Sequence, residues 1–480
     1  MTVIFFGRVA QAVLSLVMLR VMTSMLSPEE AGRWALLIAV ISFFSLGFVG
    51  PVGMFINRRL HAWVELGKIR RYMLYYAGYL VALALLISAV FYASSFVYTP
   101  VLGISLLWVI VLVGCSIFFA TLNQTYIPSL NLLGYRGWFV ILSIVTVLIS
   151  LLASFSLVYW VSPRAELWQM GQLVGQAALA VVGGVLFFHF AEKHKKKNSD
   201  VKSLQWNMVK LMGLLGFVWP LVISVLLTWV QTQSYRFIVQ DMIGLQALGL
   251  FAIGYGVSAS LIGSFESVMG AYFVPIFYKR ISSENKHKQA LAWSEYASVM
   301  FSSMVIVVTV VMIFSHEIAL VLLDESFVSA ADFIVWGALA ELARVVVGVY
   351  ALLAHAGMDT KKLIVPNMVA AISSPLFIVM LVPSWGAVGV GMALVLAGGC
   401  AILSSHVLLS KSFNIMMPWK KLMVSGLITL GFLGLGYVGH SWFGESITLM
   451  RSICWLLILG ILLLGVLYIM LKDQINKEVT

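Results

Sequence analysis

Charged residues are scarce in this sequence: they make up 10% of the 480 residues, against about 25% in a typical soluble protein. Hydrophobic residues make up 61%, and the mean hydropathy is +1.02. The apolar residues fall into fourteen segments, each long enough to cross a bilayer, which takes about 20 residues. Little chain remains for a folded domain outside the membrane. This composition excludes a soluble enzyme, a receptor with a folded ectodomain and a nucleic-acid-binding module.

Cysteine is also rare, and motifs for catalysis are missing. The three cysteines, Cys115, Cys400 and Cys454, fall inside apolar segments without paired spacing or a nearby histidine. They therefore predict neither a disulfide framework nor a metal site. The sequence has no phosphate-binding loop, no zinc-protease motif and no nucleophile elbow. We expect no enzymatic activity, no metal and no cofactor, and transport is the default function.

The sequence predicts an all-α polytopic membrane protein of about fourteen transmembrane helices, built as two six-helix bundles plus two C-terminal helices. The predicted helices span residues 3–26, 32–52, 72–96, 101–128, 137–161, 166–190, 208–233, 244–277, 292–315, 331–355, 363–383, 386–410, 421–440 and 450–471. With the N-terminus in the cytoplasm, twenty-three Lys and Arg fall on inner loops and the C-terminal tail, and four fall on outer loops. This bias places both termini in the cytoplasm. The net charge of +11 is therefore mainly topological.

A long polar stretch, residues 192–207, divides the first twelve helices into two halves. It contains the basic run Lys193–Lys197, which could also touch anionic membrane lipids, although a solvated loop is the simpler interpretation. The predicted parts are an N-terminal six-helix bundle over residues 1–191, a cytoplasmic basic linker over 192–207, a C-terminal six-helix bundle over 208–412, and two additional helices with a cytoplasmic tail over 413–480.

Internal similarity supports two related halves. Equivalent positions are Arg20 and Arg236, Gly32 and Gly249, and Gly134 and Gly357. Six helices return the chain to its starting side, so the repeat is parallel and its axis lies along the membrane normal. A transporter of this kind binds its substrate between the halves and rocks one half against the other.

Three stretches resemble a known family. Residues 25–36 read MLSPEEAGRWAL, residues 235–238 with 247–255 read YRFI and ALGLFAIGY, and residues 385–393 read WGAVGVGMA. These stretches are similar to signatures of the Wzx-type oligosaccharide flippases of the multidrug/oligosaccharidyl-lipid/polysaccharide exporter superfamily. The family more often has an apolar residue and Tyr where this chain has Arg33 and Trp34, which leaves the role of Arg33 open.

The resemblance implies a flippase that moves an undecaprenyl-pyrophosphate-linked oligosaccharide, such as an O-antigen, capsule or exopolysaccharide repeat unit. The cargo would cross from the inner to the outer leaflet of the bacterial cytoplasmic membrane by alternating access. Implied partners are the lipid-linked oligosaccharide itself and the polymerase and glycosyltransferases that consume and supply it. Two alternatives stay open: a cation-coupled exporter of drugs or other small amphipathic molecules, and an assembly component without transport activity.

Fixed cations are the natural ligands for a pyrophosphate that crosses a low-dielectric core. Intramembrane charges are costly, so Arg8, Arg20 and Arg236 are candidate substrate-binding residues. Arg20 lies about 18 Å beyond Arg8 along the first helix, at 1.5 Å per residue. For Arg8 and Arg236, reaching toward lipid headgroups is an equally good explanation.

Amide side chains form a second set of candidates for binding the sugar. Gln169, Gln172 and Gln176 lie on one helix face, and their donors and acceptors suit sugar hydroxyls. Hydrogen bonding between helices explains them equally well, since Gly171 and Gly175 lie beside them. Weaker candidates of the same kind are Asn123 and Gln124.

One carboxylate is a candidate for coupling transport to a proton or sodium gradient. Glu266 lies well inside its predicted helix, where a carboxylate can bind and release a cation during a cycle. Pairing with an arginine is the alternative explanation. Glu341 and Arg344 are three residues apart on one helix and are predicted to form an ion pair.

Overall fold

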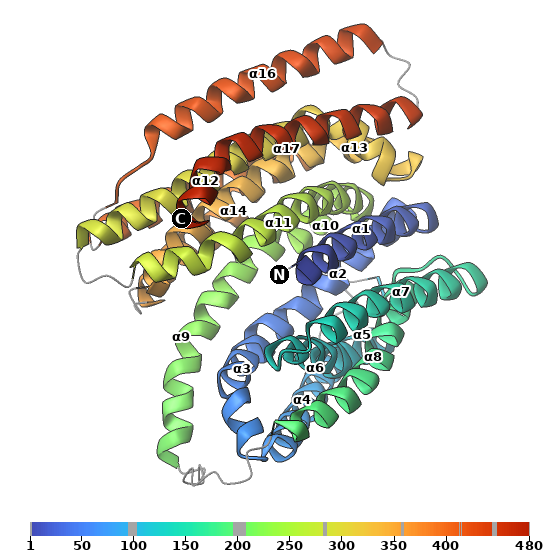
Figure 1. Cartoon of the computed structure of the whole chain (residues 1–480). Helices are drawn as coiled ribbons and strands as arrows, with labels where there is room; N and C mark the ends of the chain where they lie inside the picture. The colour runs from blue at the N-terminus through green and yellow to red at the C-terminus, as the bar shows by residue number, and fades with distance from the viewer. Residues whose placement is uncertain are drawn as a thin grey trace. The chain divides into compact units, whose positions relative to one another are not determined.

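The computed structural model describes residues 2–94, 103–194, 208–281, 286–356, 360–411, 413, 415–443 and 449–479, and every regular element in these ranges is a helix (Figure 1). Eleven helical stretches are long and apolar enough to cross a membrane. One of them, Lys361–Ser410, contains two helices, and α9 (Met208–Gln233) and α16 (Trp419–Phe443) complete fourteen. The predicted fold class, an all-α polytopic membrane protein, is therefore confirmed.

Contacts divide the chain into two compact units, Met1–Gln240 with Gly244–Gly249, and Asp241–Ile243 with Leu250–Thr480. Most of the predicted linker, residues 195–207, lies outside the described residues, so the domain boundaries drawn from the sequence stay a prediction. The helices up to the boundary region are α1 (Thr2–Met25), α2 (Pro28–Phe44), η1 (Ser45–Val49), α3 (Gly50–Glu65), α4 (Ile69–Ser94), α5 (Leu106–Cys115), η2 (Ser116–Ala120), α6 (Thr121–Leu132), α7 (Arg136–Trp160), α8 (Ala165–Lys193), α9 and α10 (Tyr235–Ile243).

The second helix is longer than the sequence analysis predicted. Residues 53–65 were expected to be loop, but α2, η1 and α3 run on without a break from Pro28 to Glu65. The π-turn η1 comes directly before Pro51 in the first turn of α3, where the missing proline N–H is least costly. In α3, Ile56, Leu60 and Trp63 are buried on one face while the arginines are exposed. An amphipathic helix thus replaces the expected loop.

Helices α7 and α8 pack closely within the first unit because small residues face each other. A Cβ atom at Gly171 would lie 2.2 Å from the Cα of Ser154, and one at Gly175 would lie 2.3 Å from Ser150 Oγ. Both serines also donate hydrogen bonds to backbone carbonyls of α8, at 2.9 Å and 3.1 Å. This close packing fixes the position of the glutamine face of α8.

The second unit contains α11 (Leu245–Ile281), apart from its first five residues, and all the helices that follow it. These are α12 (Lys286–Ile313), α13 (Ser315–Leu322), η3 (Glu325–Ala330), α14 (Ala331–Ala356), η4 (Thr360–Leu363), α15 (Ile364–Ser410), α16 and α17 (Leu449–Val479). Gly386, with φ 54° and ψ −139°, divides α15 into two helices, as predicted from the sequence. A residue without a Cβ atom adopts this conformation without strain.

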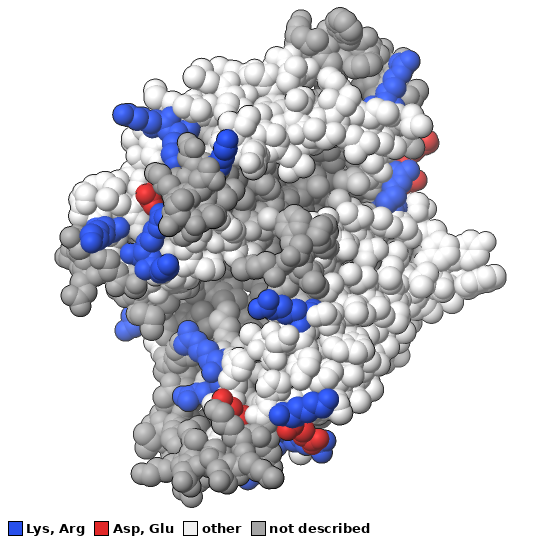
Figure 2. Space-filling model, viewed as in Figure 1, with Lys and Arg blue, Asp and Glu red and all other residues white. Residues whose placement is uncertain are grey.

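The described surface is mostly uncharged. On the face shown in Figure 2, Lys and Arg lie in small separate groups among uncharged side chains. Large apolar side chains such as Trp160, Leu107 and Met423 are more than two-thirds exposed. Apolar exposure on this scale fits helices that face lipid rather than water. The protein is thus a multi-pass membrane protein.

Candidate functional site

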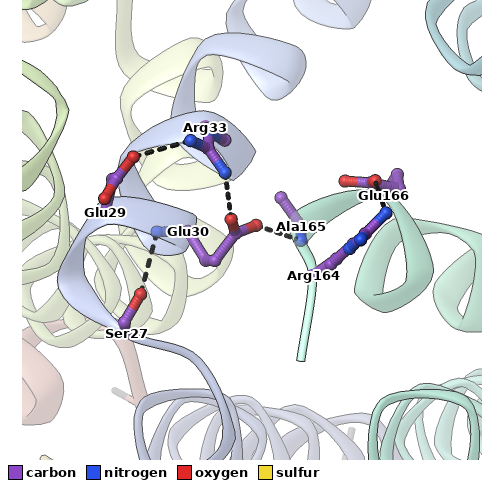
Figure 3. A network of polar contacts seen from close by, with 7 residues as sticks. All are labelled: Ser27, Glu29, Glu30, Arg33, Arg164, Ala165 and Glu166. Carbon is purple, nitrogen blue, oxygen red and sulfur yellow. Dashed lines mark hydrogen bonds and ion pairs between the residues drawn. The ribbon is translucent and has the colours of Figure 1, made fainter. Parts of the chain in front are cut away.

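The stretch at residues 25–36 forms a polar network that joins α2 to α8 (Figure 3). Ser27 is the N-cap of α2, and its hydroxyl accepts a hydrogen bond from the Glu30 N–H at 3.4 Å. Glu30 in turn accepts a hydrogen bond from the backbone N–H of Ala165 at 2.8 Å. A carboxylate at this position satisfies a free N–H at the start of α8 and interacts favourably with the helix dipole.

The structure answers what Arg33 does. Its guanidinium forms ion pairs with Glu30 and with Glu29, the latter at 2.6 Å, and its side chain is 28% exposed. It also lies against the backbone of Gly103, where a Cβ atom would come within 3.2 Å of Arg33 Nε. Arg33 therefore holds Glu30 in the orientation that caps α8 and extends the network to the start of α5. Trp34 adds a second hydrogen bond between α2 and α8, to Gln169.

The glutamines predicted to bind sugar differ in their surroundings. Gln169 is 4% exposed and accepts a hydrogen bond from Trp34 Nε1 at 3.1 Å. This contact is a hydrogen bond between two helices, α2 and α8, as the alternative explanation for the glutamines expected. Gln172 and Gln176 are only half-buried, and their backbone carbonyls, rather than their amides, accept bonds from α7 and α6.

The two weaker amide candidates separate clearly. Asn123 is 8% exposed and its amide donates to Thr146 Oγ1 at 3.5 Å and to the carbonyl of Gln176 at 3.3 Å. Gln124 is exposed. The structure thus brings Asn123 together with the glutamine face of α8 and leaves Gln124 on the surface of α6.

Two of the predicted cations lie on α1. Arg8 is exposed, donates to Gln11 Oε1 at 3.4 Å, and has its guanidinium 5.7 Å from the ring centroid of Phe139 on α7. Arg20 is half-buried, and its Nη1 atom is buried without a hydrogen-bond partner among the described residues. A buried guanidinium N–H without an acceptor is energetically costly.

The third predicted cation, Arg236, lies in the first turn of the short helix α10. Its Nη1 donates to the carbonyl of Ala35 at 2.8 Å, and its guanidinium lies 5.6 Å from the ring centroid of Tyr235. Arg236 therefore already has an acceptor on α2, unlike the Nη1 atom of Arg20.

A charged cluster joins α11 and α14 in the second unit. The predicted pair forms, with Arg344 Nε 2.6 Å from Glu341 Oε2. Arg344 Nη2 also lies 2.5 Å from Glu266 Oε2, so the coupling candidate is paired with an arginine. Tyr255 donates to Glu341 Oε1 at 2.7 Å. Neither the bond from Tyr255 to Glu341 nor the link between Glu266 and Arg344 could be predicted from spacing, because the partners are 86 and 78 residues apart.

Among the described residues, no group of three or more His, Cys, Asp and Glu side chains could hold a metal ion.

Comparisons with known proteins identify the fold. No family model matches the chain, and no curated protein matches it in sequence. The lipid II flippase MurJ in an inward closed conformation is similar in structure, with a TM-score of 0.68, 14% identity, and 99% of each chain covered. An inward-facing multidrug resistance MATE transporter of the MOP superfamily has a TM-score of 0.60 and 14% identity, and the match covers 85% of this chain and 98% of that one. An outward-facing MATE transporter has a TM-score of 0.60 and 13% identity, and the match covers 85% of this chain and 93% of that one. The chain thus has the polytopic helical fold of these membrane transporters.

Proposed function

We propose that this protein is a flippase that moves a polyprenyl-pyrophosphate-linked oligosaccharide across the bacterial cytoplasmic membrane by alternating access. The cargo is an undecaprenyl-pyrophosphate-linked repeat unit of an O-antigen, capsule or exopolysaccharide, as in the Wzx-type flippases. The observation that carries the proposal is Arg20, a membrane-helix arginine with a buried N–H that lacks an acceptor. A pyrophosphate supplies that acceptor and replaces the water that the guanidinium has lost.

The distribution of charge in the first unit supports an anionic cargo. Its described acidic residues lie in or near terminal turns of helices: Glu29, Glu30, Glu65, Glu166 and Glu192. Arg8 and Arg20, by contrast, lie inside α1. A binding site for cationic drugs needs a carboxylate near its ligand, whereas fixed cations suit a pyrophosphate.

The extent of the structural match also favours a flippase over a drug exporter. The match to the lipid II flippase covers 99% of this chain, and the matches to the two MATE transporters cover 85%. In this proposal Arg8, Arg20 and Arg236 bind the pyrophosphate, and Gln172, Gln176 and Gln124 meet the sugar. Glu266 couples the cycle to a proton or sodium gradient.

Reconstituted transport tests the proposal. The full chain is placed in proteoliposomes with a polyprenyl-pyrophosphate disaccharide that carries a fluorophore on the sugar. Loss of fluorescence to a membrane-impermeant quencher measures the fraction in each leaflet over time. We expect the wild type to equilibrate the leaflets and Arg20→Ala to reduce the rate at least tenfold, because an ion pair between a guanidinium and a phosphate is lost.

Arg71→Ala is the matched control, because Arg71 is exposed at the start of α4 and donates to the hydroxyl of Tyr75. It should transport at the wild-type rate. The same vesicles loaded with a cationic dye test the drug-exporter alternative. Efflux of the dye driven by a proton or sodium gradient, without movement of the labelled lipid, would refute the flippase assignment.

A further inference from the structure

The cluster on α11 and α14 contains two carboxylates and one guanidinium, a net charge of −1 with every group ionised. Arg344 lies between Glu341 on its own helix and Glu266 on α11. From α12, Tyr296 is the titratable side chain that interacts electrostatically with Glu266, and from α11, Tyr255 binds Glu341. One carboxylate is therefore in excess over the cation.

The two carboxylates hold Arg344 with unequal strength. The side chain of Glu341 is 4% exposed, one of its oxygens bonds the arginine, and the other accepts from the Tyr255 hydroxyl at 2.7 Å. Glu266 is 30% exposed and bonds Arg344 from a different helix. A small separation of α11 from α14 would break the contact with Glu266, whereas Glu341 shares α14 with Arg344 and would keep its contact. Glu341 thus fixes the guanidinium, and Glu266 is the exchangeable partner.

The arginine itself is accessible. Its side chain is 41% exposed, and its ion pairs use Nε and Nη2. Next to the cluster, α14 carries Gly348, where even a Cβ atom would remain 4.0 Å from Glu266 Oε1. Absence of a side chain at this position leaves room beside Glu266. A planar guanidinium held along one edge presents its remaining N–H groups to a phosphate in a fixed geometry.

We propose that Arg344 is a substrate-binding residue of the second unit and that a phosphate oxygen of the lipid-linked cargo takes the place of Glu266 on its guanidinium. The displaced Glu266 carboxylate then binds one proton from water. Protonation offsets the negative charge that the phosphate brings, because a carboxylate without its cation is costly to keep in a low-dielectric environment. The inference rests on the proposed function and adds an arginine of the second unit to those proposed to bind the phosphates of the cargo.

This exchange predicts that cargo and proton bind together. By linkage, cargo affinity falls as the pH rises through the range in which the displaced Glu266 loses its proton. A ligand that takes up one proton on binding loses up to about tenfold in affinity per pH unit there. Glu266→Gln needs no proton, so it should bind cargo independently of this equilibrium.

Binding of undecaprenyl pyrophosphate to the purified full chain in phosphatidylcholine nanodiscs, measured between pH 5.5 and 8.5, tests the exchange. We expect the wild type to lose affinity with rising pH relative to Glu266→Gln; taking this difference removes the titration of the probe itself. Arg344→Lys should bind about tenfold more weakly because the planar fork is lost. Thermal unfolding of each variant in the nanodisc identifies any that fails to fold, and Glu266→Gln keeps the side-chain shape.

The pair Arg280 and Glu295, between α11 and α12, is a matched control, since its side chains are 36% and 44% exposed. Arg280→Lys and Glu295→Gln should leave both the affinity and its pH dependence unchanged. An excess of phosphatidylglycerol in the nanodisc should not compete with the probe. Competition that disappears in Arg344→Lys would overturn the assignment by showing that Arg344 binds a membrane-lipid phosphate.

Wild-type affinity and pH dependence in both Glu266→Gln and Arg344→Lys would also overturn the inference. In that case Arg20→Ala should still weaken binding, which leaves the proposed function standing. If the wild-type chain does not bind undecaprenyl pyrophosphate at all, the proposed function itself fails.

Discussion

Gly32 on α2 and Gly249 at the start of α11 pack directly against each other's helix backbone. A Cβ atom at Gly32 would lie 2.2 Å from the carbonyl oxygen of Leu245, and one at Gly249 would lie 1.8 Å from the carbonyl oxygen of Pro28. Each glycine meets the residue four positions before the other. The offset is 217 for both pairs, since 249 − 32 and 245 − 28 agree. The two close contacts are therefore reciprocal, and both lie within the first unit.

We expect Gly32→Ala and Gly249→Ala to destabilise the protein, because a methyl group cannot fit where backbone atoms already touch. Overpacking of this kind typically costs about 1–3 kcal/mol. Gly256→Ala in α11 is the control, since a Cβ atom there would meet nothing within 4 Å; it should stabilise the helix by about 0.5–1 kcal/mol. Thermal unfolding in detergent, followed by tryptophan fluorescence, compares the variants. Equal melting temperatures for all three would contradict the close crossing.

The cap that Glu30 provides to α8 leads to a second prediction. Glu30→Ala should lower stability by about 1 kcal/mol, the usual cost of losing an N-terminal cap. Glu29→Ala removes a carboxylate from the same arginine, but Glu29 is 54% exposed, and an exposed pair contributes roughly 0.2–1 kcal/mol. Hydrogen exchange of the first turn of α8 measures the cap directly. Faster exchange near Ala165 in Glu30→Ala, and not in Glu29→Ala, is the expected outcome.

Arg20 provides a graded prediction for the proposed flippase. Arg20→Lys keeps the charge but replaces the planar guanidinium with a single ammonium, so transport should be intermediate between the wild type and Arg20→Ala. Recovery of surface glycan in a deletion strain that expresses each variant is the measurement. Full complementation by Arg20→Ala at normal protein levels would show that Arg20 does not bind the substrate.

Much of the fold was readable from the sequence because a membrane helix is a local feature. Apolar length predicted all fourteen helices, and Gly386 divides α15 where the predicted helices meet. Helix α3 was missed because its exposed arginines resemble a loop when only hydropathy is considered. Its buried positions, Ile56 and Leu60, are four residues apart and carried the missing signal.

Much less of the candidate site was readable, because its contacts join residues far apart in the chain. The i, i+3 pair of Glu341 and Arg344 was predicted from spacing alone. Spacing gave no indication that Glu266 shares that arginine, nor that Trp34 binds Gln169 across 135 residues. The same limit applies to Arg33, whose role depends on where Glu30 meets the start of α8.

The glutamine face of α8 gives the last prediction, because its members should separate into two groups. Gln169→Leu leaves the indole N–H of Trp34 without its acceptor, and an unpaired buried donor costs about 1–3 kcal/mol. Gln172→Leu and Gln176→Leu keep the hydrogen bonds that the backbone carbonyls of these two residues accept from Ser150 and Asn123. We therefore expect Gln169→Leu to lower the melting temperature, and the other two to lower transport at wild-type stability.

A double-mutant cycle separates the hydrogen bond from the packing around it. Trp34→Phe combined with Gln169→Leu removes donor and acceptor together, so the double variant should be more stable than the sum of the single losses predicts. Transport of the labelled lipid by the same variants shows whether Gln169 also contacts sugar. If Gln172→Leu and Gln176→Leu lose stability and transport in parallel, these amides serve helix packing. Other residues must then form the hydrogen bonds to the sugar.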